Sequence, residues 1–170
     1  KIKLNLNKFN KKISSKFSSK KMRLNIENEI DYNNEILDGL LEILLINNDI
    51  SIDYQVNENS LVFSSTDDED SFEGNIDLKP FYLFANLDYD RINTKSIFRE
   101  NSIIVDLIKS EIFENNNLNL NAIFNIKDII DNDQLKNLYL NFSIQEGKLN
   151  FSNSNIDWKN EVKINLNESE

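Results

Sequence analysis

The chain contains no cysteine and no histidine among its 170 residues. Disulfide bonds, thiolate nucleophiles, zinc sites of the usual kind and Ser-His-Asp triads are therefore excluded. Glycine (3 residues) and proline (1 residue) are scarce. No apolar run approaches the length of about 18 residues that a transmembrane helix needs, and no signal peptide is recognisable. The absence of cysteine does not by itself choose between a reducing and an oxidising compartment.

The composition instead favours a folded protein. Leu, Ile, Val and Phe make up about a third of the chain, well above the roughly 20% below which chains tend to stay disordered. Asparagine is abundant, with 30 residues, but its poor strand propensity is weaker than a regular burial pattern. The length suits one domain. Because the chain starts at Lys1 and stops at Glu170 just after a strand-like run, we expect a fragment of a longer protein.

Charge is distributed unevenly around a net value of −10. Residues 1–23 carry nine basic side chains and no acidic one, whereas residues 24–170 carry 10 basic and 29 acidic side chains. A basic arm of this kind is typical of contacts with nucleic acid or anionic lipid headgroups, or of a solvated strand face. The acidic remainder argues against nucleic acid, because phosphate contacts supply most of that affinity.

Alternation of apolar and polar residues with a period of two is the dominant pattern, and it predicts strands. Residues 117–126 read N-L-N-L-N-A-I-F-N-I, with apolar and Asn positions on opposite faces. The same alternation predicts strands at Ile2–Leu6, Met22–Ile26, Ile50–Val56, Leu138–Ile144, Leu149–Phe151 and Val162–Leu166. Leu37–Ile46 fits either a helix or a strand, and we favour a strand. In all, about nine strands are expected.

Phe72–Asp90 is expected to form one long extended run whose apolar positions change face near Pro80. This change of phase predicts a bulge or bend at Lys79-Pro80, where proline is tolerated. Turn-forming residues separate the other runs, at residues 47–49, 57–59, 67–70, 115–116, 131–133 and 146–147. Because the spacings are short, we expect antiparallel hairpins in a meander. Ile and Leu at helical spacing predict a short helix or helix pair across about 95–113.

Each strand has one apolar face that must be removed from water, which stabilises the fold by about 25 cal/mol per Å² buried. A second sheet can cover these faces and form a closed sandwich core. Alternatively, the sheet can curl into a groove that an apolar ligand fills. Periodicity alone does not choose between these two folds.

One stretch of the chain resembles a known protein family. Residues 72–82, F-E-G-N-I-D-L-K-P-F-Y, followed by L-F-A-N-L-D-Y at 83–89, look like the G-x-I-D-L-K-P-F strand of bacterial AsmA-like proteins of the AsmA/TamB group. The Ile/Leu-rich stretch 94–113, the alternating strand Leu135–Ile144, and the hairpin ending at Trp158 are similar to the same family. The resemblance covers about residues 30–170, and residues 1–29 read as a basic strand and loop arm. We interpret residues 1–170 as a single segment of a larger protein.

The resemblance implies a mostly β fold, in which an antiparallel meander forms a curled, groove-like sheet, a repeating β-groove. It implies a periplasmic module, anchored to the inner membrane of Gram-negative bacteria through a segment outside this chain. The implied function is lipid transport in outer membrane biogenesis, with phospholipid acyl chains carried in the groove between membranes. The implied partners are phospholipid, adjacent repeats of the same chain, and proteins of the inner and outer membranes. A continuous apolar groove lets a lipid tail slide without full exposure to water.

On this interpretation the alternating apolar residues line the groove and the Asn-rich face meets water. The predicted lining residues are Ile50, Ile52, Tyr54, Val56, Ile76, Leu78, Leu118, Leu120, Phe124, Ile126, Leu138, Leu140, Phe142, Ile144, Val162, Ile164 and Leu166. No catalytic residue, metal ligand or cofactor is expected, and the protein is not interpreted as an enzyme. The competing interpretation is a structural or adhesion-type β-domain with a closed sandwich core and no ligand.

Acidic residues are the remaining candidates for chemistry. Residues 67–70, D-D-E-D, offer oxygen ligands for a divalent cation, but they lack the EF-hand spacing and read more simply as a solvated turn. The pairs Asp88/Asp90 and Asp131/Asp133 would act as acid and base only if they faced one another across a substrate. In a chain with 29 acidic residues, such pairs arise by chance, and we expect no hydrolase activity.

Overall fold

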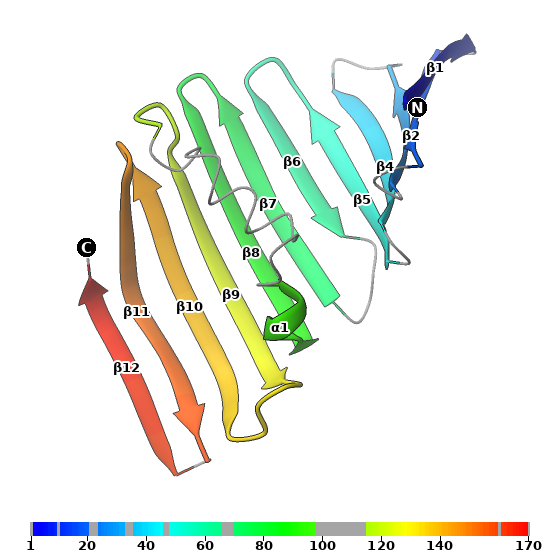
Figure 1. Cartoon of the computed structure of the whole chain (residues 1–170). Coiled ribbons are helices and arrows are strands. Elements are labelled where there is room, and N and C mark those ends of the chain that lie inside the picture. Colours follow the sequence, from blue (N-terminus) through cyan, green and yellow to red (C-terminus); the bar gives the residue numbers. More distant parts are fainter. Residues whose placement is uncertain are drawn as a thin grey trace. The chain divides into compact units, whose positions relative to one another are not determined.

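The computed structural model of the chain consists almost entirely of β-strands (Figure 1). It describes residues 2–9, 11–20, 24–32, 36–45, 48–65, 70–97, 115–159 and 161–169. The strands are β1 (Ile2–Phe9), β2 (Lys12–Ser19), β3 (Leu24–Asp31), β4 (Leu37–Leu45), β5 (Asn48–Val56), β6 (Ser60–Ser65), β7 (Asp70–Leu78), β8 (Phe81–Ile92), β9 (Leu120–Ile129), β10 (Leu135–Gln145), β11 (Lys148–Trp158) and β12 (Val162–Ser169). One helical turn, α1 (Thr94–Ile97), follows β8. The prediction of a mostly β protein is confirmed.

The strands fall into two compact units, Lys1–Leu78 and Lys79–Glu170, named here the first and the second unit. The first unit contains β1–β7, and the second contains β8–β12. Residues 1–29 do not stand apart from the strands that follow, because β1 pairs with β2 and β2 pairs with β3.

The first unit is a single antiparallel sheet with the strand order β1-β2-β3-β4-β5-β6-β7. Each strand pairs with the next one along the chain, so the predicted meander is confirmed here. β4 confirms the strand at residues 37–45. β2 and β6 are additional to the predicted strands. β2 reads K-I-S-S-K-F-S-S, and its two apolar residues are too few to mark a strand by alternation alone.

Asparagine side chains build several of the tight turns. In the β5–β6 turn, Asn57 Oδ1 accepts hydrogen bonds from the backbone N–H groups of Asn59 (2.9 Å) and Ser60 (2.8 Å). In the β9–β10 turn, Asn132 Oδ1 accepts one from the Gln134 N–H at 3.1 Å. The amide oxygen of Asn takes the place of a backbone acceptor in such turns. The turns predicted at 57–59 and 131–133 are therefore confirmed, and they account for part of the asparagine content.

The second unit is also a single sheet, with the strand order β8-β9-β10-β11-β12. β9 to β12 pair as antiparallel hairpins, but β8 and β9 run parallel, with Leu83 opposite Leu120 and Tyr89 opposite Ile126. The expectation of a meander throughout is therefore wrong at this pair. Parallel neighbours need a connection that returns to the starting end of the sheet, and residues 93–119 are long enough to do so.

The described strands form an open arrangement. The strand order is linear in each unit, and no second sheet covers the apolar face within either unit among the described residues. The closed sandwich core, one of the two folds that the sequence allows, is therefore not formed by the described strands. The apolar faces must be protected in another way.

The segment Phe72–Asp90 is not one extended run. β7 ends at Leu78, the chain turns at Lys79 and Pro80, and β8 begins at Phe81. The change of apolar phase near Pro80 therefore marks a turn between two strands instead of a bulge within one. Both arrangements shift the alternation, so the sequence pattern did not distinguish them.

Of the helix or helix pair predicted across about 95–113, the described chain includes only the single turn α1. Residues 98–114 lie outside the described residues, so the remainder stays a prediction. Asp131, which follows β9, accepts hydrogen bonds from the backbone N–H (3.1 Å) and the hydroxyl (2.7 Å) of Thr94 at the start of α1. The Thr94 hydroxyl lowers the pKa of Asp131. These bonds hold the end of β8 beside the end of β9.

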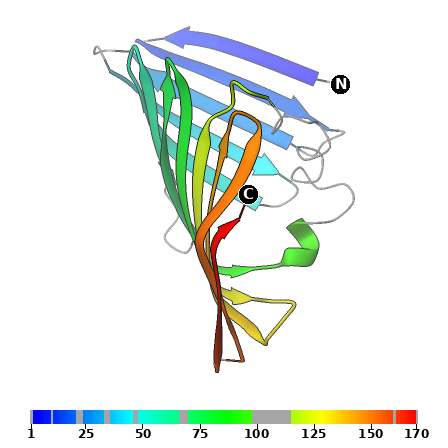
Figure 2. The ribbon, with the colours of Figure 1, turned by 90° about the vertical axis from the view of Figure 1, so that its left-hand side faces the viewer.

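Two bulges interrupt the β10–β11 hairpin, whose strands bend along their length (Figures 1 and 2). The register shifts between Lys136 and Tyr139, and again between Tyr139 and Phe142. Asn137 and Asn153, each with a φ of 49°, are the extra residues at these shifts. Asn adopts the left-handed conformation at a lower cost than other residues with a Cβ atom. The two bulges therefore give asparagine a second structural role in this chain.

The bulge assignment predicts opposite effects for two substitutions of Asn153. Asn153→Gly should keep or slightly raise the free energy of unfolding, because glycine adopts a positive φ without steric cost. Asn153→Val should lower it by roughly 1–2 kcal/mol, the cost of the left-handed conformation. Denaturant titration measures both. Asn155→Val, at a regular position opposite Tyr139, is the control, and an equal loss for both valine variants would contradict the bulge at Asn153.

Candidate functional site

The strand register creates one apolar face on the first unit, because residues opposite one another in neighbouring strands point to the same side of a sheet. One row contains Ile26, Ile43 and Ile50, on β3, β4 and β5. The described side chains of this first apolar face are Ile13, Phe17, Leu24, Ile26, Ile30, Leu37, Leu41, Ile43, Ile50, Ile52, Tyr54, Val56, Leu61, Phe63, Phe72, Ile76 and Leu78. The face therefore extends across β2 to β7, with Ser15, Ser19 and Asn28 as polar positions on the same side.

No described side chain of the first apolar face is buried. Most are half-buried, and the exposed fraction reaches 37% at Ile50 and 44% at Leu78. Neighbours in the same sheet shield the flanks of each side chain, but among the described strands of this unit no second layer covers the face. Apolar area left in water costs about 25 cal/mol per Å². The face is therefore suited to an apolar partner.

The second unit has a corresponding second apolar face on β8 to β12. Its described side chains are Leu83, Ala85, Leu87, Tyr89, Leu118, Leu120, Ala122, Phe124, Ile126, Leu138, Leu140, Phe142, Ile144, Leu149, Phe151, Ile156, Trp158, Val162, Ile164 and Leu166. Its centre is buried, because Leu120, Ala122 and Ile144 form a cluster in which Ile144 is 2% exposed. Its outer strand β12 is exposed.

Three aromatic rings cross the second apolar face. Phe124 stacks on Phe142 with 5.9 Å between ring centroids and 14° between ring planes, and Phe142 contacts Phe151 at 6.2 Å. Such aromatic pairs contribute about 0.5–1.5 kcal/mol beyond their buried area. The bulge at Asn153 corrects the alternation of β11, so that Phe151 and Ile156 lie on the same face.

The 17 predicted lining residues all lie on these two faces. Six are on the first apolar face and eleven on the second: Ile50, Ile52, Tyr54, Val56, Ile76 and Leu78, and then Leu118, Leu120, Phe124, Ile126, Leu138, Leu140, Phe142, Ile144, Val162, Ile164 and Leu166. Sequence reasoning missed Ile43, Leu83 and Phe151 as members of the faces. The strands of Ile43 and Leu83 are apolar on both sides, and the bulge hides the phase of Phe151.

Charged residues pair across the opposite, polar face of the first unit. Lys12 and Lys16 on β2 form ion pairs with Glu29 and Glu27 on β3. The hydrogen bond to Glu29 raises the pKa of Lys12. The acidic strand beside the basic arm thus compensates part of its charge, which favours a solvated strand face for these two lysines.

Two hollows lie along this polar face, with volumes of about 340 and 360 Å³. Glu27 and Glu42, directly opposite one another on β3 and β4, line both of them. Within the described part of the chain, no group of three or more acidic side chains is placed to hold a metal ion. The charged lining does not suit an acyl chain. The hollows therefore do not compete with the apolar faces as a lipid site.

Three of the four carboxylates considered for acid–base chemistry are engaged elsewhere. Asp90 pairs with Lys127, and this hydrogen bond lowers the pKa of Asp90. Asp88 Oδ2 accepts a hydrogen bond from the Asn86 amide at 3.2 Å. Asp131 is held by Thr94, as described above. Asp67, Asp68 and Glu69, the first three residues of the predicted acidic turn, lie outside the described residues.

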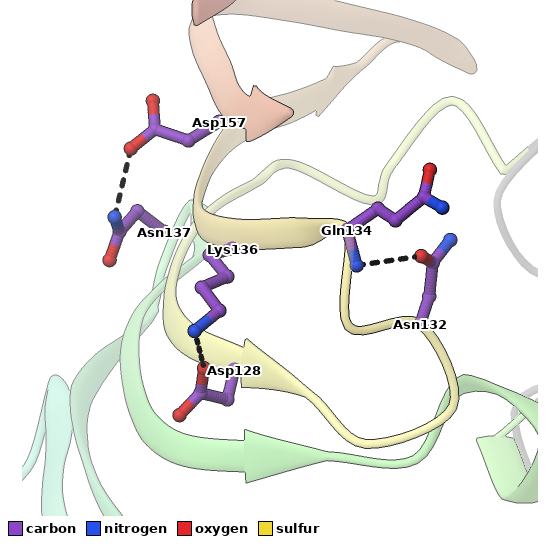
Figure 3. A network of polar contacts seen from close by, with 6 residues as sticks. All are labelled: Asp128, Asn132, Gln134, Lys136, Asn137 and Asp157. Atoms are coloured by element: carbon purple, nitrogen blue, oxygen red, sulfur yellow. Dashed lines mark hydrogen bonds and ion pairs between the residues drawn. The ribbon is translucent and has the colours of Figure 1, made fainter. Parts of the chain in front are cut away.

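A polar network surrounds the bulge at Asn137 (Figure 3). The Asn137 amide donates to Asp157 Oδ2 at 2.8 Å, and Lys136 Nζ lies 3.6 Å from Asp128 Oδ1. These contacts join β9, β10 and β11 where the apolar alternation of the second unit ends. We interpret these contacts as stabilising the sheet, because each of the four side chains already has a partner.

Tyr54 is the one predicted lining residue with a polar anchor that the structure resolves. Its hydroxyl donates a hydrogen bond to Asn28 Oδ1 at 2.6 Å, and its ring lies over Gly39, the residue opposite it on β4. A Cβ atom at position 39 would overlap the ring. Glycine is therefore required at position 39 to seat the aromatic ring on the apolar face. Burial raises the pKa of the Tyr54 phenol.

The chain matches no family model, no curated protein and no solved structure. No helix among the described residues is long and apolar enough to cross a membrane. The two apolar faces are therefore the features of the chain that indicate a function.

The burial of Tyr54 over Gly39 predicts a raised phenol pKa that can be measured. Its phenol should ionise above the ordinary pKa of 10.0, so the part of the stability that depends on the neutral phenol is present below pH 10 and is lost as pH rises through the folded-state pKa. Gly39→Ala should displace the ring, return the pKa towards 10.0 and cost roughly 1 kcal/mol of stability. Ultraviolet difference titration against Tyr54→Phe isolates this tyrosine, and an unchanged pKa in Gly39→Ala would contradict the predicted contact.

Proposed function

We propose that this chain is a lipid-binding module that carries phospholipid acyl chains along its apolar faces, as part of a protein that bridges membranes. The observation that carries the proposal is the first apolar face. It spans β2 to β7 on a single open sheet, and none of its described side chains is buried.

The physical argument is that an acyl chain and this face protect one another from water. The side chains of the face are branched aliphatic and aromatic groups, without a charged residue among those that define it. Contact with a lipid tail is non-directional, so a tail can bind in many equivalent positions along the face. The carrier therefore needs no precise pocket.

The two apolar faces differ in the exposure of their side chains, and therefore in how well each can contact a lipid. On the second apolar face, the centre at Leu120, Ala122 and Ile144 is buried, so it supports the sheet. The exposed side chains of the second apolar face lie on β11 and the edge strand β12, beside this buried centre. On the first apolar face, Ile50 and Leu78 remain exposed. The lipid contact is therefore assigned chiefly to β5 and β7 of the first unit.

The cellular setting of the proposal comes from the resemblance to AsmA-like proteins. On this proposal the module lies in the periplasm of a Gram-negative bacterium and is held to the inner membrane by a segment outside this chain. Phospholipid, adjacent repeats of the same chain and membrane proteins at either end are the corresponding partners. No enzymatic step is part of the proposal.

Native mass spectrometry with lipid extraction tests the proposal directly. The chain, expressed in the periplasm of a Gram-negative host, should retain phospholipid in near-stoichiometric amounts. A well-folded, lipid-free protein that also fails to bind added short-chain phospholipid would overturn it. That outcome would favour the structural or adhesion-type role, with the apolar faces covered by protein.

A matched pair of substitutions locates the binding face. Ile50→Asn should weaken binding of a short-chain phospholipid about fivefold, because it removes a partly exposed apolar side chain from the first apolar face. Leu44→Asn is the control. Leu44 is exposed to a similar extent (41% against 37%), but it lies on the polar face, opposite Asp49. Equal losses in the two variants would contradict binding on the first apolar face.

A further inference from the structure

β1 and β12 are open edge strands. Among the strands that the structure describes, β1 pairs with β2 alone in the first unit, and β12 pairs with β11 alone in the second. Val162, Ile164 and Leu166 on β12 are 48%, 50% and 42% exposed. Each strand is eight residues long and contains no proline. Edges of this kind are templates for pairing with another chain.

The two edge strands have nearly the same sequence. Ile2–Asn7 reads I-K-L-N-L-N, and Val162–Asn167 reads V-K-I-N-L-N. Four of the six positions are identical, and the other two exchange one branched aliphatic residue for another. Apolar and polar positions therefore alternate in the same phase on both edges.

We propose that β12 of one copy pairs with β1 of a second copy in antiparallel orientation, which joins copies of this chain head to tail. One register sets all three apolar positions of β1 opposite those of β12: Ile2, Leu4 and Leu6 face Leu166, Ile164 and Val162. Apolar matching of this kind determines register in a sheet, because a shift by one residue exchanges the two faces.

The polar positions support the same register. Lys3 stands opposite Asn165, and Lys163 stands opposite Asn5, so no like charges face one another. A parallel pairing in the same phase would set Lys3 beside Lys163, and like charges directly opposite one another destabilise a sheet. Antiparallel pairing is therefore the favoured orientation.

The charges near the two edge strands favour pairing of a β1 edge with a β12 edge over pairing of two β1 edges. Residues 2–20 carry six lysines and no acidic residue, whereas residues 161–170 carry three glutamates and one lysine. Two β1 edges would bring two basic arms together, whereas a β1 and a β12 edge combine opposite signs. A head-to-tail contact of this kind leads to a ring or a filament. The inference does not rest on the proposed lipid function.

Disulfide trapping tests the register without ambiguity, because the chain has no native cysteine. Leu4→Cys protein mixed with Ile164→Cys protein under oxidising conditions should give a mixed disulfide dimer, since facing residues of paired strands lie within disulfide reach. Neither variant alone should dimerise to a comparable extent. Asn5→Cys, one position along β1 and on the other face, replaces Leu4→Cys as the control and should give several-fold less product.

Equal yields with Leu4→Cys and Asn5→Cys would overturn the register, and equal yields from mixed and unmixed samples would overturn the head-to-tail contact. A mixed disulfide between Phe17→Cys and Ile164→Cys, without one at Leu4→Cys, would overturn the pairing of β12 with β1. It would instead indicate that the two copies exchange strands. In that case β12 would replace β1 on β2, where Leu4 normally pairs with Phe17.

Asn165 provides a second test that leaves the apolar face unchanged. It is exposed, pairs with Asn155 in its own chain, and stands opposite Lys3 in the proposed register. At low salt, Asn165→Glu should strengthen self-association about two- to fivefold and Asn165→Lys should weaken it to a similar extent. Sedimentation over a range of protein concentrations measures both. Equal association of the two variants, or a monomer at every concentration, would overturn the proposal.

Discussion

A sheet that is only one layer thick leaves much of its own apolar face uncovered, and this constraint governs the rest of the structure. In the first unit, the antiparallel strands align apolar residues on one side, and none of the described side chains that make up the first apolar face is buried. A closed sandwich would remove the same residues from water without outside help. An open sheet makes its stability depend on what covers the face, and thereby links folding to binding.

The abundant asparagine fits this architecture through two properties of its side chain. The short amide completes turns by accepting backbone hydrogen bonds, as Asn57 and Asn132 do. It also tolerates a positive φ, which Asn137 and Asn153 use to form bulges in the β10–β11 hairpin. The bulge at Asn153 keeps Phe151 and Ile156 on one face despite the extra residue. A residue with poor strand propensity thus helps a β-sheet to remain continuous.

The polar side of the first unit is organised by charge. Lysines on β2 pair with glutamates on β3, whereas Glu27 and Glu42 face one another on β3 and β4. Exposed ion pairs of this kind add little stability, so their main effect is to match β2 with its acidic neighbour. The contrast between a charged side and an apolar side is the reason why the proposed lipid contact is assigned to the apolar side.

Much of the fold follows from local alternation, which the sequence alone reveals. The period of two predicted most strands and the face occupied by each of the 17 lining residues, because successive side chains in a strand point to opposite sides wherever the strand pairs. Alternation did not detect β2, whose small polar residues become a strand only between β1 and β3. It also assigned Phe72–Asp90 to one run, because a turn and a bulge shift the phase in the same way.

Only the tertiary structure decided how the strands combine. The parallel pairing of β8 with β9 depends on where the connection returns the chain, which is a property of residues far apart in sequence. The choice between an open sheet and a closed sandwich depends on contacts between whole layers, and both arrangements require the same alternation. The sequence alone therefore determined a β protein with one apolar face per strand, and the tertiary structure decided that this face stays open in the first unit and is buried at its centre in the second.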